Sequence, residues 1–128
     1  MTSNLRWHIA FALLGFTMAS PATAQTAKPP AAPAYVGTWS IEAANCKLGQ
    51  EQEGAPLSVK TKRLDQHEAH CEFPSVRQAG PARWTAQATC TVEGNKEKRR
   101  LALRVTDGKL TVDWGDGVTT TYARCQSK

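Results

Sequence analysis

Four cysteines are the residues of this chain with the clearest chemistry. They are Cys46, Cys71, Cys90 and Cys125. An even number of cysteines in a short exported chain predicts a disulfide framework, although the count alone leaves the pairing open. We expect two bridges, because a domain this small buries little apolar area and each bridge typically adds about 2–4 kcal/mol.

A second group of reactive side chains lies in the segment His67-Glu68-Ala69-His70-Cys71. Two imidazoles, a carboxylate and a thiol in one short segment could ligate zinc or copper. On a β-strand, however, residues three apart point to opposite faces, so His67 and His70 converge only if the segment turns or is helical. Cys71 is also needed for a disulfide. We therefore interpret both histidines as surface residues and predict neither a metal nor a cofactor.

The chain lacks the patterns that indicate catalysis. No serine stands in a nucleophile elbow, and no glycine-rich phosphate loop precedes a helix. Asp107, Asp113 and Asp116 fall on predicted turns and solvated strand positions, where aspartate is common. With every cysteine expected in a bridge, no free thiol is left for nucleophilic chemistry. The sequence therefore predicts a protein that is not an enzyme.

Residues 1–24 have the organisation of a secretory signal peptide. Arg6 supplies a positive start, residues 9–16 are apolar, and Ala22-Thr23-Ala24 is a small-x-small cleavage pattern. The apolar run is too short to span a bilayer. We expect cleavage after Ala24 and a periplasmic or secreted bacterial protein that begins at Gln25 and has no membrane anchor.

The remaining chain divides into a proline- and alanine-rich linker, residues 25–34, and one folded domain, residues 35–128. Removing the leader removes one arginine and no acid, so the net charge of +5 becomes +4. Basic residues cluster at Lys60–Arg63 and Lys96–Arg100. Such runs can bind acidic partners, but on a solvated strand they also discourage edge pairing. For an exported protein we do not expect nucleic acid as the partner.

The elements that must position these residues are predicted by alternation. Residues 84–92 alternate apolar and polar side chains, and the pattern continues through residues 101–105 and 110–114. The face formed by the first of these segments consists of Trp84, Ala86, Ala88, Cys90 and Val92. Period two in several segments, with turn residues between them, indicates an antiparallel meander. No helical period and no internal repeat is evident.

Turn residues set the expected register, because a slip of one residue would invert a strand. A two-residue loop at Asp107-Gly108 is a strong type I′ signal. It opposes Val105 to Leu110, Leu103 to Val112 and Leu101 to Trp114. A two-residue loop at Gly94-Asn95 opposes Val92 to Glu97, Ala88 to Leu101, Ala86 to Leu103 and Trp84 to Val105.

Two further loops complete the expected meander. A three-residue loop, Gly115-Asp116-Gly117, puts Val118 and Tyr122 on the apolar face. A loop over Ala79–Ala82 places Cys71 opposite Cys90, which predicts the first bridge. With strands also expected at residues 36–41 and 57–59, about seven or eight short strands result. A small antiparallel up-and-down β-barrel would remove their exposed edges, so the predicted fold class is all-β.

The segment Tyr35–Ile41 contains the motif Gly37-x-Trp39 at the start of the first strand. This opening resembles that of the calycins, the group of lipocalins, fatty-acid-binding proteins and small bacterial inhibitors of secreted metalloproteases. The resemblance implies that Trp39 plugs one end of the barrel and that Arg124, on the final strand, packs across the indole as a cation–π contact. The chain also resembles small exported bacterial proteins with a Gly-Thr-Trp opening and a terminal Tyr-x-Arg-Cys.

Closure of the first strand onto the last also suggests the second bridge. Cys46 follows the first strand and Cys125 follows the last, so a Cys46–Cys125 bridge would tie the two together. It requires α-carbons within about 7 Å of each other.

The leading functional hypothesis is a binding protein whose loops contact a protein partner, most concretely an inhibitor of a protease or other hydrolase. Its candidate contact residues are Gln25 and Thr26 in the linker, and Arg77 and Arg83 beside the Gly80-Pro81 turn. The alternative is a lipocalin-type carrier of a small apolar ligand, with Trp84 and Trp114 bordering a cavity. A third possibility is a structural component of the cell envelope.

Overall fold

The computed structural model describes residues 20–127, so most of the predicted leader lies outside the described residues. Within them the chain forms strands and one short 3₁₀ helix. In chain order the elements are β1 (Gly37–Ser40), η1 (Ala43–Lys47), β2 (Leu57–Lys60), β3 (Arg63–Gln66), β4 (Ala69–Glu72), β5 (Val76–Gly80), β6 (Arg83–Val92), β7 (Asn95–Thr106), β8 (Lys109–Asp113) and β9 (Thr119–Arg124). The domain is all-β, as predicted.

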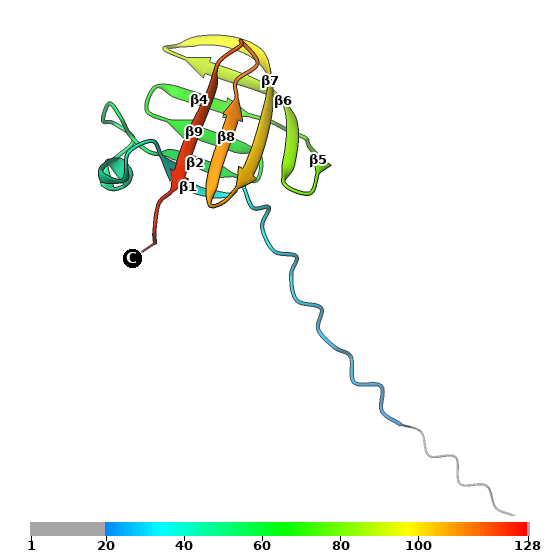
Figure 1. Cartoon of the computed structure of the whole chain (residues 1–128). Helices are drawn as coiled ribbons and strands as arrows, with labels where there is room; N and C mark the ends of the chain where they lie inside the picture. The colour runs from blue at the N-terminus through cyan, green and yellow to red at the C-terminus, as the bar shows by residue number, and fades with distance from the viewer. Residues whose placement is uncertain (1–19, 128) are drawn as a thin grey trace, which may run out of the picture.

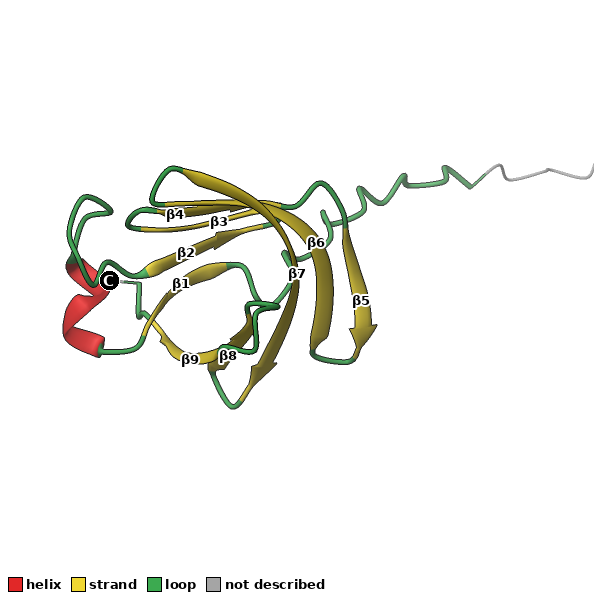
Figure 2. Cartoon of the chain, turned by 90° about the horizontal axis from the view of Figure 1, so that it is seen from above, coloured by secondary structure: helices red, strands yellow, loops and turns green. Residues whose placement is uncertain are grey.

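The strands close into an eight-stranded antiparallel barrel (Figure 1, Figure 2). Neighbours along the chain pair from β1 to β4 and from β6 to β9, while β9 pairs with β1 and β4 pairs with β6 to complete the ring. β6 is long enough to pair with β4 near its C-terminal end and with β5 near its N-terminal end. β4 and β5 therefore share one position in the wall, interrupted at residues 73–75.

β5 is the exception to this closure. Within the described chain it is hydrogen-bonded to β6 alone, and its other edge has no strand beside it. Every other strand has a neighbour on both sides. The barrel thus removes all but one of the edges that an open sheet would expose.

The core is built from the inward side chains of the alternating strands. The large, fully buried members are Trp39, Tyr35, Phe73, Leu57, Leu64, Leu101, Leu103, Leu110, Val59 and Val112, together with the Cys71–Cys90 bridge. Trp84, Val105 and Trp114 are partly buried and pack against them. Side chains therefore fill the barrel, as is usual at this strand number.

The Asp107-Gly108 hairpin forms in the predicted register. Val105 pairs with Leu110 and Leu103 with Val112. Both turn residues have the positive φ that a type I′ turn requires, 52° at Asp107 and 70° at Gly108. The third expected pair, Leu101 with Trp114, does not form because β8 ends at Asp113.

The expected register between β6 and β7 is wrong by two residues. The turn is Glu93-Gly94, with φ of 48° and 82°, and Val92 pairs with Asn95. As a result Ala86, not Ala88, opposes Leu101. A shift of two leaves every side chain on its predicted face, so alternation cannot detect it. The shift arises because Glu93 adopts a left-handed conformation that glycine and asparagine adopt more readily.

The loop between β5 and β6 is also shorter than expected. It consists of Pro81 and Ala82, because β5 continues to Gly80, which pairs with Arg83. The register with β6 then shifts twice: at an irregularity between Gln78 and Gly80, and at the break at residues 73–75. Cys71 therefore still pairs with Cys90, so the pairing is confirmed although the predicted loop is wrong.

The last hairpin has the expected three-residue loop. The Trp114 N–H donates to the Val118 carbonyl at 3.0 Å, which frames residues 115–117. Tyr122 is buried and pairs with Leu110, as predicted. Val118 is 53% exposed, so its expected inward position is wrong, because the loop carries it beyond the packed part of the barrel.

Two elements were absent from the sequence-based expectation. β3 carries only one buried side chain, Leu64, among charged and amide neighbours, so it has no visible apolar alternation. η1 is five residues long and buries none of them, so it has no helical period. η1 nevertheless carries Cys46 to the end of β9.

Both disulfides have the predicted pairing. Cys46 is bonded to Cys125 across 79 residues of sequence, and Cys71 to Cys90 across 19. Beside the first bridge, the Cys125 N–H donates to the Thr38 carbonyl at 2.8 Å, which extends the contact between β9 and β1. Two formed bridges indicate an oxidising, extracellular type of environment.

Candidate functional site

The seam between β1 and β9 is held by an arginine lying on a tryptophan. The guanidinium carbon of Arg124 is 4.0 Å from the ring centroid of Trp39, as the resemblance implies. Its two terminal nitrogens donate to the carbonyls of Val36 at 3.2 Å and Ala34 at 2.6 Å. The Trp39 Nε1 donates to the Tyr35 carbonyl at 2.9 Å. Arg124 therefore makes structural contacts to the residues that precede β1.

The glycine of the opening motif is explained by the same arginine. Gly37 has a φ of 149°, and a Cβ built at this position would lie 2.5 Å from the Arg124 Nη1. Any side chain there would have to displace the guanidinium. The spacing Gly-x-Trp thus lets the backbone pass close to an arginine that covers the indole two residues later.

The two tryptophans proposed as ligand-binding residues lie in separate places. Trp84 stacks edge-on against Tyr35, with ring centroids 5.1 Å apart, in a surface pocket with Thr61, Lys62 and Val76. Trp114 lies in another pocket, where its Nε1 donates to the Thr120 hydroxyl at 3.1 Å. The structure does not bring the two indoles together around one cavity.

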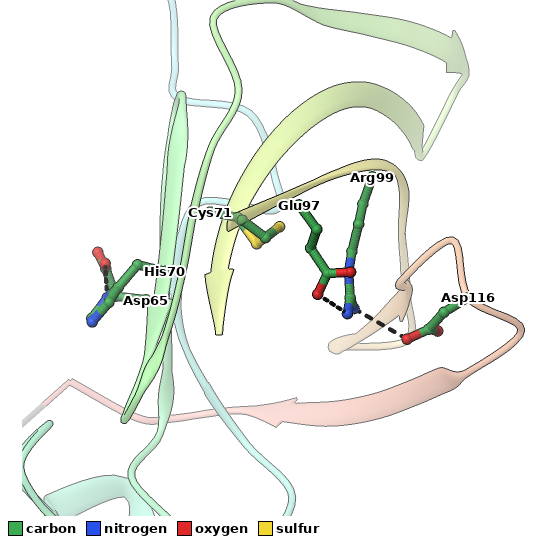
Figure 3. Close-up of a disulfide and its surroundings, with 7 residues drawn as sticks. Asp65, His70, Cys71, Glu97, Arg99 and Asp116 are labelled. Carbon is green, nitrogen blue, oxygen red and sulfur yellow. Dashed lines mark hydrogen bonds and ion pairs between the residues drawn. A yellow bond between two sulfur atoms is a disulfide. The ribbon is translucent and has the colours of Figure 1, made fainter. Parts of the chain in front are cut away.

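The two histidines also point to different partners. His70 Nδ1 is 2.8 Å from an Asp65 carboxylate oxygen, whereas His67, in the β3–β4 turn with a φ of 46°, has its Nδ1 3.2 Å from the Gln50 carbonyl. Figure 3 shows the Asp65–His70 pair on the opposite side of the strands from the Cys71 disulfide. Within residues 20–127 no group of three or more potential metal-ligating side chains is found.

Asp65 is the one carboxylate here with a shifted pKa. Burial by itself would raise the pKa, but hydrogen bonds from Arg63 and His70 outweigh it, so the pKa lies below its usual value. The Arg63 Nε donates to the carboxylate at 2.8 Å, and its Nη1 donates to Glu72 at 2.9 Å. Arg63 is therefore paired on the outer face of β3 and β4.

An arginine on the inner row of β7 is paired as well. Arg99 contacts the carboxylate of Glu97 on its own strand and that of Asp116 in the β8–β9 loop, the latter at 3.1 Å (Figure 3). It lines the pocket that also contains Trp114 and Tyr122. Burial raises the pKa of Tyr122, whose hydroxyl donates to the Gln66 side chain at 3.3 Å. These polar groups close that end of the core.

The candidate partner-binding residues lie in two regions. Arg77 and Arg83 are exposed on β5 and β6, where Arg77 pairs with Thr85 and Arg83 with Arg104. Gln25 and Thr26 are exposed in the extended segment that runs away from the barrel (Figure 1). The structure brings Arg77 and Arg83 onto neighbouring strands but does not bring Gln25 or Thr26 to them.

Sequence reasoning missed a row of cations on the outer face of β7. Alternate residues of this strand are exposed and basic, namely Lys96, Lys98, Arg100 and Arg104. The signal was present, because the same alternation that predicts the inward Leu101 and Leu103 also predicts which basic residues point outward. Considered as one basic run, residues 96–100 do not distinguish these outward cations from the inward Glu97 and Arg99.

No protein-family model, curated protein or solved structure matches this chain. Its function is therefore inferred from its own residues. Among residues 20–127, no helix has the length and apolar character needed to cross a membrane.

Proposed function

We propose that this chain is an exported, non-enzymatic binding protein that acts through its outer surface, most concretely as an inhibitor of a protease or other hydrolase. The observation that carries the proposal is the edge of β5, which has no strand beside it in a barrel that is otherwise closed. An exposed edge is a ready template for an extended segment of another protein. The calycin-like character of the barrel, with Arg124 on Trp39, is compatible with this role.

The surroundings of the edge favour a protein partner. Arg77 lies on β5, and Arg83 begins β6 opposite Gly80, so a partner strand paired with the free edge of β5 would run beside Arg77, with Arg83 one strand further in. The N-terminal segment reaches the barrel close by, because Pro33 shares a surface pocket with Val76 and Gln78 of β5. A bridged scaffold loses little entropy when it presents such an edge, which favours tight binding.

A carrier function has less support. The barrel axis is occupied by large buried side chains, and the two tryptophans border different surface pockets. A ligand site normally encloses most of its ligand in one concave, mostly apolar cavity. Tryptophan fluorescence titrated with lipids and aromatic compounds should therefore stay unchanged, and saturable quenching would favour the carrier.

Inhibition is tested with the purified mature chain against bacterial metalloproteases, serine proteases and lysozymes. The protein should inhibit one class in a one-to-one complex. The double variant Arg77→Ala, Arg83→Ala should weaken inhibition by about tenfold or more, since truncating charged contacts at an interface typically costs at least this much. The double variant Lys47→Ala, Lys109→Ala is the matched control, because it removes two exposed cations, on η1 and β8, away from β5. Failure to inhibit any of these enzymes would reject the inhibitor function.

Export is tested separately. The chain expressed with its leader in a bacterium should be recovered from the periplasm or medium, with Gln25 as its first residue. N-terminal sequencing or intact mass gives the answer, and a full-length cytoplasmic product would contradict the proposal.

A further inference from the structure

The outer face of β5, β6 and β7 carries a continuous set of cations, here called the basic face. It consists of Arg77 from β5, Arg83 from β6, and Lys96, Lys98, Arg100 and Arg104 from β7, all exposed. The remaining outward positions of β6 and β7 are uncharged: Thr85, Gln87, Thr89, Thr91, Ala102 and Thr106. The acids nearest to this face lie on the neighbouring strands, where Asp113 of β8 opposes Ala102 and Glu72 of β4 opposes Thr89. Within the described chain, neither forms an ion pair with a member of the basic face.

Alternation separates the charges of the β7 cluster. Glu97 and Arg99 lie on the inner row and pair with each other, and Arg99 also pairs with Asp116. In the sequence, Lys98 lies between Glu97 and Arg99, and Arg100 follows Arg99. Both Lys98 and Arg100 belong to the outer row. Among the ion pairs and side-chain hydrogen bonds of residues 20–127, none involves a member of the basic face. These side chains are therefore available to a ligand.

The arrangement of the basic face does not serve the stability of the barrel. Arg83 and Arg104 are direct cross-strand partners on the same face. Like charges opposite one another destabilise a sheet. Since neither side chain contacts an acid within the described chain, an anion from outside would relieve this repulsion.

A groove lies within the basic face. It has a volume of about 500 Å³ and is lined by Ser75, Val76, Arg77, Thr85, Ala86, Gln87 and Arg100. It forms beside the break at residues 73–75, where the wall passes from β4 to β5. Two guanidinium groups on one groove suit a carboxylate or sulfate, because arginine binds such groups through paired hydrogen bonds. The neighbouring hydroxyl and amide groups suit sugar hydroxyls.

We propose that the basic face binds a linear acidic polysaccharide, with one acidic group held between Arg77 and Arg100. Alternate residues of a strand lie about 6.6–6.8 Å apart, so the outer row from Lys96 to Arg104 extends about 26–27 Å. This row is long enough for its cations to contact several acidic groups of one extended polyanion at the same time. The proposal goes beyond hydrolase inhibition, because four of the six cations lie on β7, although Arg77 and Arg83 are shared with the proposed inhibitor contact.

Other polyanions fit this face less well. Single-stranded nucleic acid is usually bound by aromatic platforms, but Tyr35 and Tyr122 are buried, while Trp84 and Trp114 pack against the core. A membrane surface needs apolar side chains that insert, and the exposed large apolar residues of the described chain, Ile41 and Val118, lie outside β5–β7. An acidic protein would normally add apolar or aromatic anchors, which the outer row of β7 does not offer.

The test measures the affinity of the purified mature protein for fluorescently labelled polyuronate and sulfated-glycan oligosaccharides, with neutral dextran as the negative probe. Binding to at least one acidic oligosaccharide should be saturable and should weaken steeply as salt increases. Lys98→Gln combined with Arg100→Gln should lower the affinity by about tenfold or more, since each removes a charge-assisted contact. Arg100→Lys should lower it less, because the charge remains while the paired hydrogen bonds are lost.

Lys28→Gln combined with Lys47→Gln is the matched control, since it also removes two exposed positive charges, and neither residue lies on β5, β6 or β7. An equal loss of affinity in this variant would show attraction by net charge only and would overturn the site. Equal or stronger binding of single-stranded DNA or of vesicles with anionic lipids would overturn the choice of a polysaccharide. Circular dichroism and melting of each variant exclude unfolding as the cause. Inhibition retained by the Lys98, Arg100 double variant would separate this proposal from the inhibitor function.

Discussion

Two strand pairs of the barrel are stabilised in different ways: β1 with β9, the seam, and β6 with β7, here called the ribbon. At the seam the strands have four and six residues, and their contact is reinforced by Arg124 on Trp39 and by the Cys46–Cys125 bridge. The ribbon has strands of ten and twelve residues and is held by a long antiparallel ladder. The seam therefore uses its cation for structure, whereas the outward cations of the ribbon, unlike the inward Arg99, form no ion pair within the described chain.

The largest loss in the free energy of unfolding is expected when the disulfide bridges are removed. The Cys46–Cys125 bridge spans 79 residues of sequence and the Cys71–Cys90 bridge 19. From loop-closure entropy, replacing the first pair by alanine should cost about 4–5 kcal/mol and replacing the second about 3 kcal/mol. Urea unfolding of the two double variants measures this. The comparison would be contradicted if the variant without the Cys46–Cys125 bridge were at least as stable as the variant without the Cys71–Cys90 bridge.

Trp39→Ala should destabilise the protein nearly as much as loss of the Cys46–Cys125 bridge. The side chain is fully buried, and its loss removes the surface on which Arg124 lies, so a cost of about 3–5 kcal/mol is expected. Thermal unfolding followed by circular dichroism is the measurement. The matched change in the ribbon, Trp84→Ala, should cost less because Trp84 is only partly buried.

Substitution of single arginines gives the sharpest contrast. Arg124→Gln removes the cation–π contact and two hydrogen bonds to backbone carbonyls, and should cost about 1–2 kcal/mol. Arg104→Gln relieves repulsion from Arg83 and should leave stability unchanged or raise it by about 0.2–1 kcal/mol. Denaturant melts of both variants decide the matter. Equal destabilisation would mean that the ribbon arginine also has a structural partner.

The smallest effect is expected outside both strand pairs, at Asp65, which is paired with Arg63 and His70 and affects stability in acid. The pKa of Asp65 is lowered in the folded protein, so its contribution is present above the unfolded value of about 3.9 and is lost as the pH falls through the folded pKa. Asp65→Asn should therefore reduce stability at neutral pH but flatten its decline below about pH 4. Melting temperatures measured from pH 7 to pH 2 test this. Parallel pH profiles would show that the Asp65 pairing is not linked to folding.

Side-chain alternation and turn residues made the fold class, the Cys71–Cys90 bridge and two of the three expected pairs of the Asp107-Gly108 hairpin predictable. The Cys46–Cys125 bridge was predictable from the expected closure of the first strand onto the last. Alternation failed where the determining information is not periodic. The register at Glu93-Gly94 depends on one residue accepting a left-handed backbone, and β3 depends on tertiary pairing around the single buried Leu64. The outward cations of β7 were within reach of the same alternation, but the break at residues 73–75, which opens a groove beside Arg77, has no local signature.

The two bridges differ in when they can form if the polypeptide emerges with its N-terminus first. Cys71 and Cys90 belong to strands that pair with each other, so that bridge needs nothing that comes later in the chain. Cys46 must wait for Cys125, which follows every strand of the barrel. Until then its thiol stays exposed to incorrect partners. Early oxidation of Cys71 with Cys90 would leave Cys46 only one thiol of its own chain to join.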